Sequence, residues 1–160
     1  MSMTDNLPSV VDSDEFIVRR TVTIAAPIEK VWAAVTEPQH LSRWFGQATV
    51  LDELAVGARG LLTWDDYGAI PILIEELDPP RTVAYRWSNE SGNAILADDV
   101  DPGRSTVFRF TLEDVDGSTQ LTVVESGFDT LSTPAESMES NRGGWDHELD
   151  ELVAYLEGGW

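Results

Sequence analysis

Hydrophobic and polar positions alternate along several short segments of this chain. Residues 16–24 form the first of them. There, Val18, Val22 and Ile24 share one face and threonines occupy the other, which predicts a half-buried strand. Six more strands are predicted further along, separated by turn signals such as the Asp-Gly pair at 116–117. They span 48–52, 59–65, 70–77, 82–87, 106–113 and 120–126.

Three other segments show the spacing of amphipathic helices. The first begins at Pro27, where proline suits a helix start, and ends at Pro38; its apolar residues recur at i, i+3, i+4 and i+7 from Ile28. A second, short helix is predicted at 39–44. The last runs from Pro134 to about residue 156 and has charged residues on its other side. Its apolar stripe consists of Trp145, Leu149, Leu152 and Leu156.

The order of these segments predicts an α+β domain with an antiparallel sheet. Hairpin-length connections join most of the strands, whereas a parallel sheet would need helical crossovers. The apolar face of the sheet needs a cover, and the terminal helix has the only long apolar stripe able to provide it. We expect residues 1–14 to be a flexible acidic tail and residues 15–158 to form a single domain. Within it, residues 88–104 are expected to be a long surface loop or, alternatively, a lid.

Composition narrows the class of protein. The chain has 160 residues, enough for one well-packed domain, and no cysteine, so disulfides and thiolate-bound metals are excluded. The net charge of −19 disfavours binding to nucleic acid and to anionic lipid surfaces. This acidity has two interpretations, a solubilising surface and an adaptation to high salt. Because no signal-like or membrane-spanning stretch occurs, we expect a cytoplasmic protein.

Motifs for catalysis, metals and cofactors are missing from the sequence. The two histidines, His40 and His147, do not have the spacing of metal ligands. Neither a G-x-S-x-G motif nor a glycine-rich phosphate loop occurs. We therefore predict no catalytic residue, no metal and no cofactor.

Two charged residues are predicted to lie on apolar strand faces. Strand periodicity turns Arg20 to the same side as Val18 and Val22, and it turns Glu125 to the same side as Val123. A buried charge is costly unless it is paired. We therefore expect Arg20 and Glu125 either to meet each other or to contact a polar group of a ligand. The alternative is that both reach water at strand ends.

Aromatic residues are numerous enough to surround a cavity as well as to fill a core. Large rings around a concave sheet commonly leave a pocket for an apolar or flat ligand, which a few polar groups orient. Tyr85, Thr106 and Asn141 are the polar candidates, while an ordinary core also explains most of the rings. The predicted pocket residues are Arg20, Trp44, Phe45, Trp64, Tyr85, Trp87, Phe108, Phe110, Glu125, Phe128, Asn141 and Trp145.

Two glycines, Gly143 and Gly144, interrupt the terminal helix, where each costs about 1 kcal/mol relative to alanine. We expect their missing side chains to let the helix approach the sheet or to leave room for a ligand beside Trp145.

Three segments of the chain resemble one known family. They are FIVRRTVTIAAPIEKVWAAVTEPQHLSRWF, LTVVESGF and NRGGWDHELDELVAYLEG. Their motifs and order resemble START-like (SRPBCC) proteins of the family named for the heat-shock-protein-90 ATPase activator homologues, over about residues 16–158. The resemblance implies a helix-grip (Bet v-like) fold: a curved antiparallel sheet of six or seven strands, two short helices and a long C-terminal helix over a pocket. It implies no particular reaction.

The sequence leaves three functions open. We expect a protein that binds a small hydrophobic molecule, such as a lipid or an aromatic metabolite, inside the domain. The resemblance implies a second function, a co-chaperone whose partner is a heat-shock ATPase. A third is a pocket enzyme that catalyses cyclisation, dehydration or hydrolysis with Arg20, Glu125 or Tyr85. A monomer and a homodimer are both compatible with the sequence.

Overall fold

The fold is built from eight strands and three helices in the part of the chain that the computed structural model describes, residues 6–45, 48–64, 68–87 and 105–158. The strands are β1 (Val10–Asp12), β2 (Ile17–Ile24), β3 (Ala48–Leu51), β4 (Arg59–Trp64), β5 (Gly68–Asp78), β6 (Thr82–Trp87), β7 (Thr106–Val115) and β8 (Ser118–Ser126). The helices are α1 (Ile28–Thr36), α2 (Pro38–Trp44) and α3 (Pro134–Glu157), with a 3-10 turn, η2 (Phe128–Thr130).

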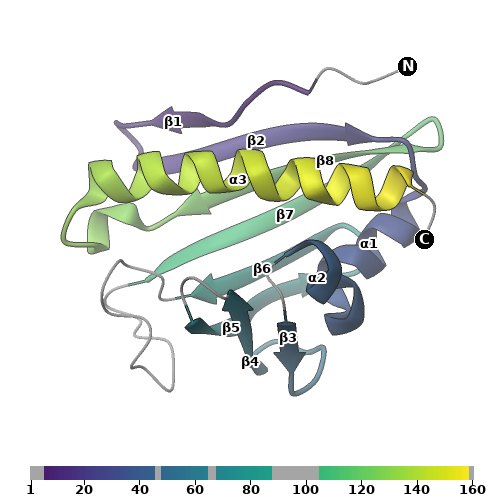
Figure 1. The fold of residues 1–160 in the computed structure, drawn as a ribbon, viewed down its shortest axis with the longest axis horizontal. Helices are drawn as coiled ribbons and strands as arrows, with labels where there is room; N and C mark the ends of the chain where they lie inside the picture. The colour runs from purple at the N-terminus through teal and green to yellow at the C-terminus, as the bar shows by residue number, and fades with distance from the viewer. Residues whose placement is uncertain (1–5, 46–47, 65–67, 88–104, 159–160) are drawn as a thin grey trace.

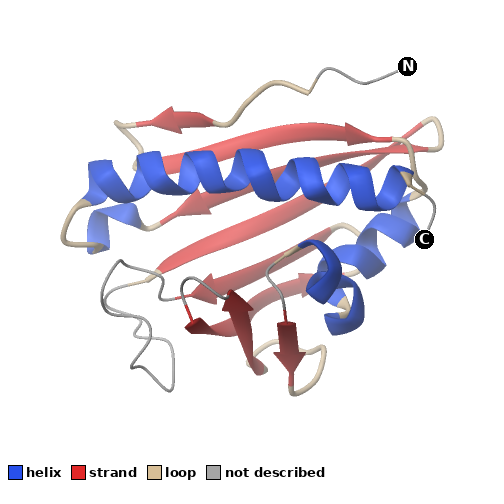
Figure 2. Cartoon of the chain, in the orientation of Figure 1, coloured by secondary structure: helices blue, strands red, loops and turns tan. Residues whose placement is uncertain are grey.

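The strands form one antiparallel sheet in the order β1-β2-β8-β7-β6-β5-β4-β3. Figure 1 shows α3 lying lengthwise across one face of this curved sheet, with α1 and α2 near the C-terminal end of α3. Figure 2 shows the same layering of one long helix over the strands. The predicted α+β helix-grip architecture is therefore confirmed, and the sheet has one strand more than the six or seven expected.

Alternation along the strands places the core on the face under α3. In β2, Val18, Val22 and Ile24 are fully buried, as their spacing predicts. In β8, Leu121 and Val123 are equally buried, while Thr122 between them is half-exposed. Hydrophobic burial on this one face is the dominant favourable contribution to folding.

The terminal helix buries the stripe that the sequence predicts. Pro134 occupies its first position, and the helix continues to Glu157. The stripe residues Trp145, Leu149, Leu152 and Leu156 are each at most 2% exposed. Full burial of a leucine side chain contributes about 1.5–3 kcal/mol. These four positions therefore hold α3 against the sheet.

The structure places a strand inside the expected N-terminal tail. Residues 10–12 form β1 and pair with residues 17–19 of β2. Continued in the same register, Pro8 would lie opposite Thr21, and proline has no N–H to donate. Pairing resumes at Asn6, whose side-chain amide bonds to both the N–H and the C=O of Thr23. Part of the expected tail thus protects the edge of β2.

The two glycines of α3 do not have the role that the sequence suggested. Gly143 and Gly144 lie on the exposed side of the helix, and a Cβ atom on either would meet nothing described within 4 Å beyond the neighbouring residues and backbone of its own helix. The interpretation that they allow close approach to the sheet is wrong. Helical periodicity turns Trp145 inward and so turns its two predecessors outward. The predicted loop at 88–104 lies outside the described residues.

Candidate functional site

A buried carboxylate lies at the centre of the face that α3 covers. Glu125 of β8 is 0% exposed. Its Oε1 accepts hydrogen bonds from Trp145 Nε1 at 2.8 Å and Asn141 Nδ2 at 3.0 Å. Its Oε2 accepts from Thr106 Oγ1 at 2.5 Å, Trp87 Nε1 at 2.9 Å and Asn141 Nδ2 at 3.0 Å. Four side chains therefore saturate the acceptor sites of this one carboxylate.

Three structural elements position these four donors. Trp87 ends β6 and pairs with Thr106, the first residue of β7. Trp145 and Asn141 are four residues apart on α3, so they project from the same side of the helix. The site therefore exists only when the helix is seated on the sheet.

The negative charge of the Glu125 carboxylate has no positively charged neighbour among the described residues. No lysine, arginine or histidine in the described part of the chain forms an ion pair with Glu125. Burial raises the pKa of Glu125 above its ordinary value, and the four hydrogen bonds only partly oppose this effect. A carboxylate without a counter-charge is costly to bury, so a perturbed group of this kind marks a functional-site candidate.

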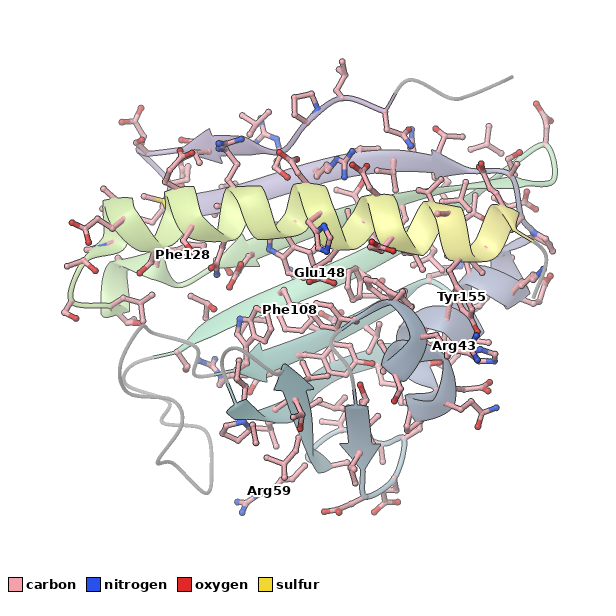
Figure 3. All side chains as sticks on the ribbon, in the orientation of Figure 1. Arg43, Arg59, Phe108, Phe128, Glu148 and Tyr155 are labelled. Carbon is pink, nitrogen blue, oxygen red and sulfur yellow. The ribbon has the colours of Figure 1, made fainter. Side chains whose placement is uncertain are left out.

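Two of the donors to the carboxylate, Trp87 and Trp145, pack against Phe45 and Phe108, and we call these four rings the aromatic cluster. Every pair of rings in the cluster has its centroids 4.5 to 6.2 Å apart. Each ring is at most 6% exposed. Figure 3 shows Phe108 on the face of the sheet that α3 crosses. Four of the predicted pocket residues thus lie together, and the described rings contact one another.

Three more predicted aromatic residues adjoin the cluster and anchor α1. Phe110 lies 5.6 Å from Phe108 and 6.2 Å from Trp44, measured between centroids. Trp44 donates its indole N–H to the carbonyl of Ala34, and Tyr85 donates its hydroxyl to the carbonyl of Val35 at 2.6 Å. Burial raises the pKa of Tyr85 far above its ordinary value. Because its oxygen is already bonded and its deprotonation is disfavoured, the geometry does not support Tyr85 as an acid or base.

Arg20 points to the inner face of β2, but it does not pair with Glu125. Its guanidinium donates to the carbonyls of Leu7, Trp145 and Asp146, at 2.9, 3.4 and 2.9 Å, and to Asp150 Oδ1 at 2.8 Å. It is only 5% exposed, so the alternative that it reaches water is also wrong. Arg20 instead fastens α3 and the N-terminal segment to the edge of the sheet.

Two predicted pocket residues lie outside this arrangement. Phe128 of η2 is fully buried, and Figure 3 shows it near the N-terminal end of α3, away from Phe108. Trp64 ends β4, and its side chain lies outside the described residues. The sequence interpretation also missed that the indole N–H groups of Trp87 and Trp145 bind the carboxylate. The signal available was Glu125 itself, since a carboxylate on an apolar face requires donors.

A groove lies apart from the carboxylate. Asn6, Leu7, Pro8, Val10, Arg19, Arg20, Thr21 and Thr23 line a groove of about 370 Å³ between the N-terminal segment and β2. In the same described ranges, no three acidic or histidine side chains converge as metal ligands would. No helix among these residues is long and apolar enough to cross a membrane.

The fold and this site define a helix-grip protein of the START-like class. Residues 25–157 match the family model described as Activator of Hsp90 ATPase homolog 1-like protein. The chain therefore belongs to this family, as the resemblance in its sequence implied. No curated protein matches the chain.

Solved structures share the fold. DynU16, from the dynemicin biosynthetic locus, is 27% identical with a TM-score of 0.70; the match covers 89% of this chain and 48% of DynU16. This chain thus spans about half the length of DynU16. MLL2253 from Mesorhizobium loti is 24% identical with a TM-score of 0.70, over 89% of this chain and 98% of that protein. The Aha1 dimer from Colwellia psychrerythraea is 20% identical with a TM-score of 0.68, over 88% and 96% of the two chains.

Proposed function

We propose that this protein binds a small hydrophobic or aromatic molecule between α3 and the concave face of the sheet, at the aromatic cluster. The helix-grip fold supports a ligand-binding domain. The observation that carries the proposal is Glu125, a fully buried carboxylate held by donors from β6, β7 and α3, with no cation beside it among the described residues.

Stability alone does not account for such a group. Apolar residues of similar volume commonly replace buried ionic groups without loss of stability. Ligand sites, in contrast, combine mostly aromatic walls with a small number of placed polar groups. The cluster and its carboxylate have that composition. Because the described rings touch, we propose that ligand entry moves Trp145 of α3 away from Trp87 and Phe108 of the sheet.

The test uses 1-naphthalenemethanol, a neutral aromatic probe, in a thermal-shift titration followed by calorimetry. A molecule that binds only the folded state raises the melting temperature with concentration. Phe108→Leu, within the cluster, should weaken binding of the probe about tenfold by removing ring contact. Phe128→Leu makes the same change in another fully buried phenylalanine and should leave binding unchanged. Equal effects of the two variants on binding of the probe would contradict the proposal.

A further inference from the structure

We infer that the molecule bound at the aromatic cluster is an organic cation, an amine whose ammonium group takes the place of the Asn141 amide beside Glu125. This inference rests on the proposed function and adds the chemical class of the ligand. It follows from the charge, the donors and the rings at the site.

The charge at the site is negative and has no cationic partner in the part of the chain that the structure describes. The four described groups that donate to Glu125 are neutral: two indoles, one hydroxyl and one amide. Neutral donors lower the cost of the buried charge but do not cancel it. The net charge of −19 adds a field that draws cations toward the protein and repels anions. Fatty acids and phosphorylated molecules are therefore disfavoured as ligands.

One donor is placed so that a ligand can replace it. Trp87, Thr106 and Trp145 are at most 6% exposed, whereas Asn141 is half-buried on α3. The Asn141 amide bridges both carboxylate oxygens at 3.0 Å each. An ammonium group in that position would make charge-assisted hydrogen bonds, which are about twice as strong as neutral ones. Exchange of the amide for the ammonium is thus favourable for the carboxylate.

The surrounding rings suit the hydrophobic part of such an amine. Trp87 and Trp145 bond to different oxygens of Glu125, and their centroids are 6.2 Å apart. Because each indole donates an in-plane N–H, the carboxylate lies at the edges of these two rings, and an ammonium bound there is held by the charge of Glu125 rather than by a ring face. The hydrophobic part of the amine would contact the rest of the aromatic cluster.

The experiment compares three naphthalene probes that differ in charge: 1-naphthylmethylamine, 1-naphthalenemethanol and 1-naphthoate. Calorimetry at neutral pH should show that the amine binds at least about tenfold more tightly than the alcohol, and that the carboxylate binds most weakly. Equal affinity for amine and alcohol would overturn the cation inference while the proposed binding function stands. If none of the three probes binds, the proposed function fails as well.

Two variants test which residues give the preference for the amine. Glu125→Gln keeps the shape of the side chain and removes its charge, so the preference for the amine over the alcohol should vanish. Asn141→Ala keeps the carboxylate and vacates the position assigned to the ammonium, so binding of the amine should be retained or strengthened. Loss of amine binding in Asn141→Ala, with the melting temperature unchanged, would overturn the assigned position. The comparison of probes on the parent protein needs neither variant.

Discussion

Trp145 of α3 and Glu125 of β8 are joined by an N–H···O hydrogen bond of 2.8 Å that is buried on both sides. The bond connects the helix that covers the sheet to a carboxylate on the sheet itself. The carboxylate therefore receives this hydrogen bond only when α3 packs on the sheet. The first two predictions follow from this dependence.

Trp145→Phe should lower the free energy of unfolding by about 1.5–3 kcal/mol, because it removes a hydrogen bond to a buried charge. Trp44→Phe provides the control: Trp44 is as buried, but its indole donates to a neutral backbone carbonyl, that of Ala34. Its expected cost is about 0.5–1.5 kcal/mol. Urea denaturation of both variants measures the difference. An equal loss of unfolding free energy in the two variants would show that the bond to the buried carboxylate contributes no more than a bond to a backbone carbonyl.

The stability of the protein should depend on pH through Glu125. Burial raises the pKa of this carboxyl in the folded state, so the unfolded chain releases the proton at a lower pH. The contribution of Glu125 is fully present below the unfolded pKa, and it is lost as the pH rises through the folded pKa. Glu125→Gln cannot titrate and removes this dependence.

Thermal or urea unfolding of the parent protein and Glu125→Gln across pH 4 to 8 tests this prediction. The free energy of unfolding of the parent, relative to the variant, should fall as the pH rises. Taking the difference cancels the titration of the many exposed carboxylates. If the difference instead grows with pH, the hydrogen bonds lower the pKa of Glu125 by more than burial raises it.

Arg20→Lys should lower the free energy of unfolding more than Asp150→Asn does. The guanidinium of Arg20 reaches the Leu7 and Asp146 carbonyls and Asp150 at once, a fork that a lysine ammonium does not reproduce. We expect Arg20→Lys to cost about 1–3 kcal/mol of unfolding free energy. The Asp150 side chain is 67% exposed, so its ion pair contributes less than about 1 kcal/mol. Chemical denaturation that ranks the two variants the other way would contradict this account.

Alanine at Gly143 and Gly144 should stabilise the protein. Each glycine lies in open space within a helix, and alanine favours the helix by about 1 kcal/mol per position. The double variant should therefore unfold at a higher urea concentration than the parent. A lower urea midpoint would indicate that the glycines make a contact, beyond those described, that alanine disrupts.

The melting temperature should rise with KCl concentration. A net charge of −19 on 160 residues produces self-repulsion in the compact state. Salt screens it, because the Debye length falls from about 10 Å at 0.1 M to about 3 Å at 1 M. Differential scanning calorimetry between these concentrations measures the effect. A marked gain toward 1 M supports salt adaptation, whereas a flat response would contradict this prediction and support a solubilising surface.

The sequence by itself determined the elements and their layering. Alternation in β2 and β8, and the stripe from Trp145 to Leu156, depend on backbone periods that local sequence reveals. The same alternation indicated that Arg20 and Glu125 face inward, and both are buried. Strand β1 escaped prediction because three residues are too few to show a period, and it is held by pairing with β2.

Only the tertiary structure decided which side chains meet. Periodicity turns Arg20 and Glu125 to the same face but does not fix their separation across that face. That depends on strand register and on where α3 rests. The seated helix brings Trp145 and Asn141 to the carboxylate and gives Arg20 the helix carbonyls and Asp150 instead. A charge buried in a folded chain is satisfied by whichever partners the packing supplies, and these partners are distant in sequence.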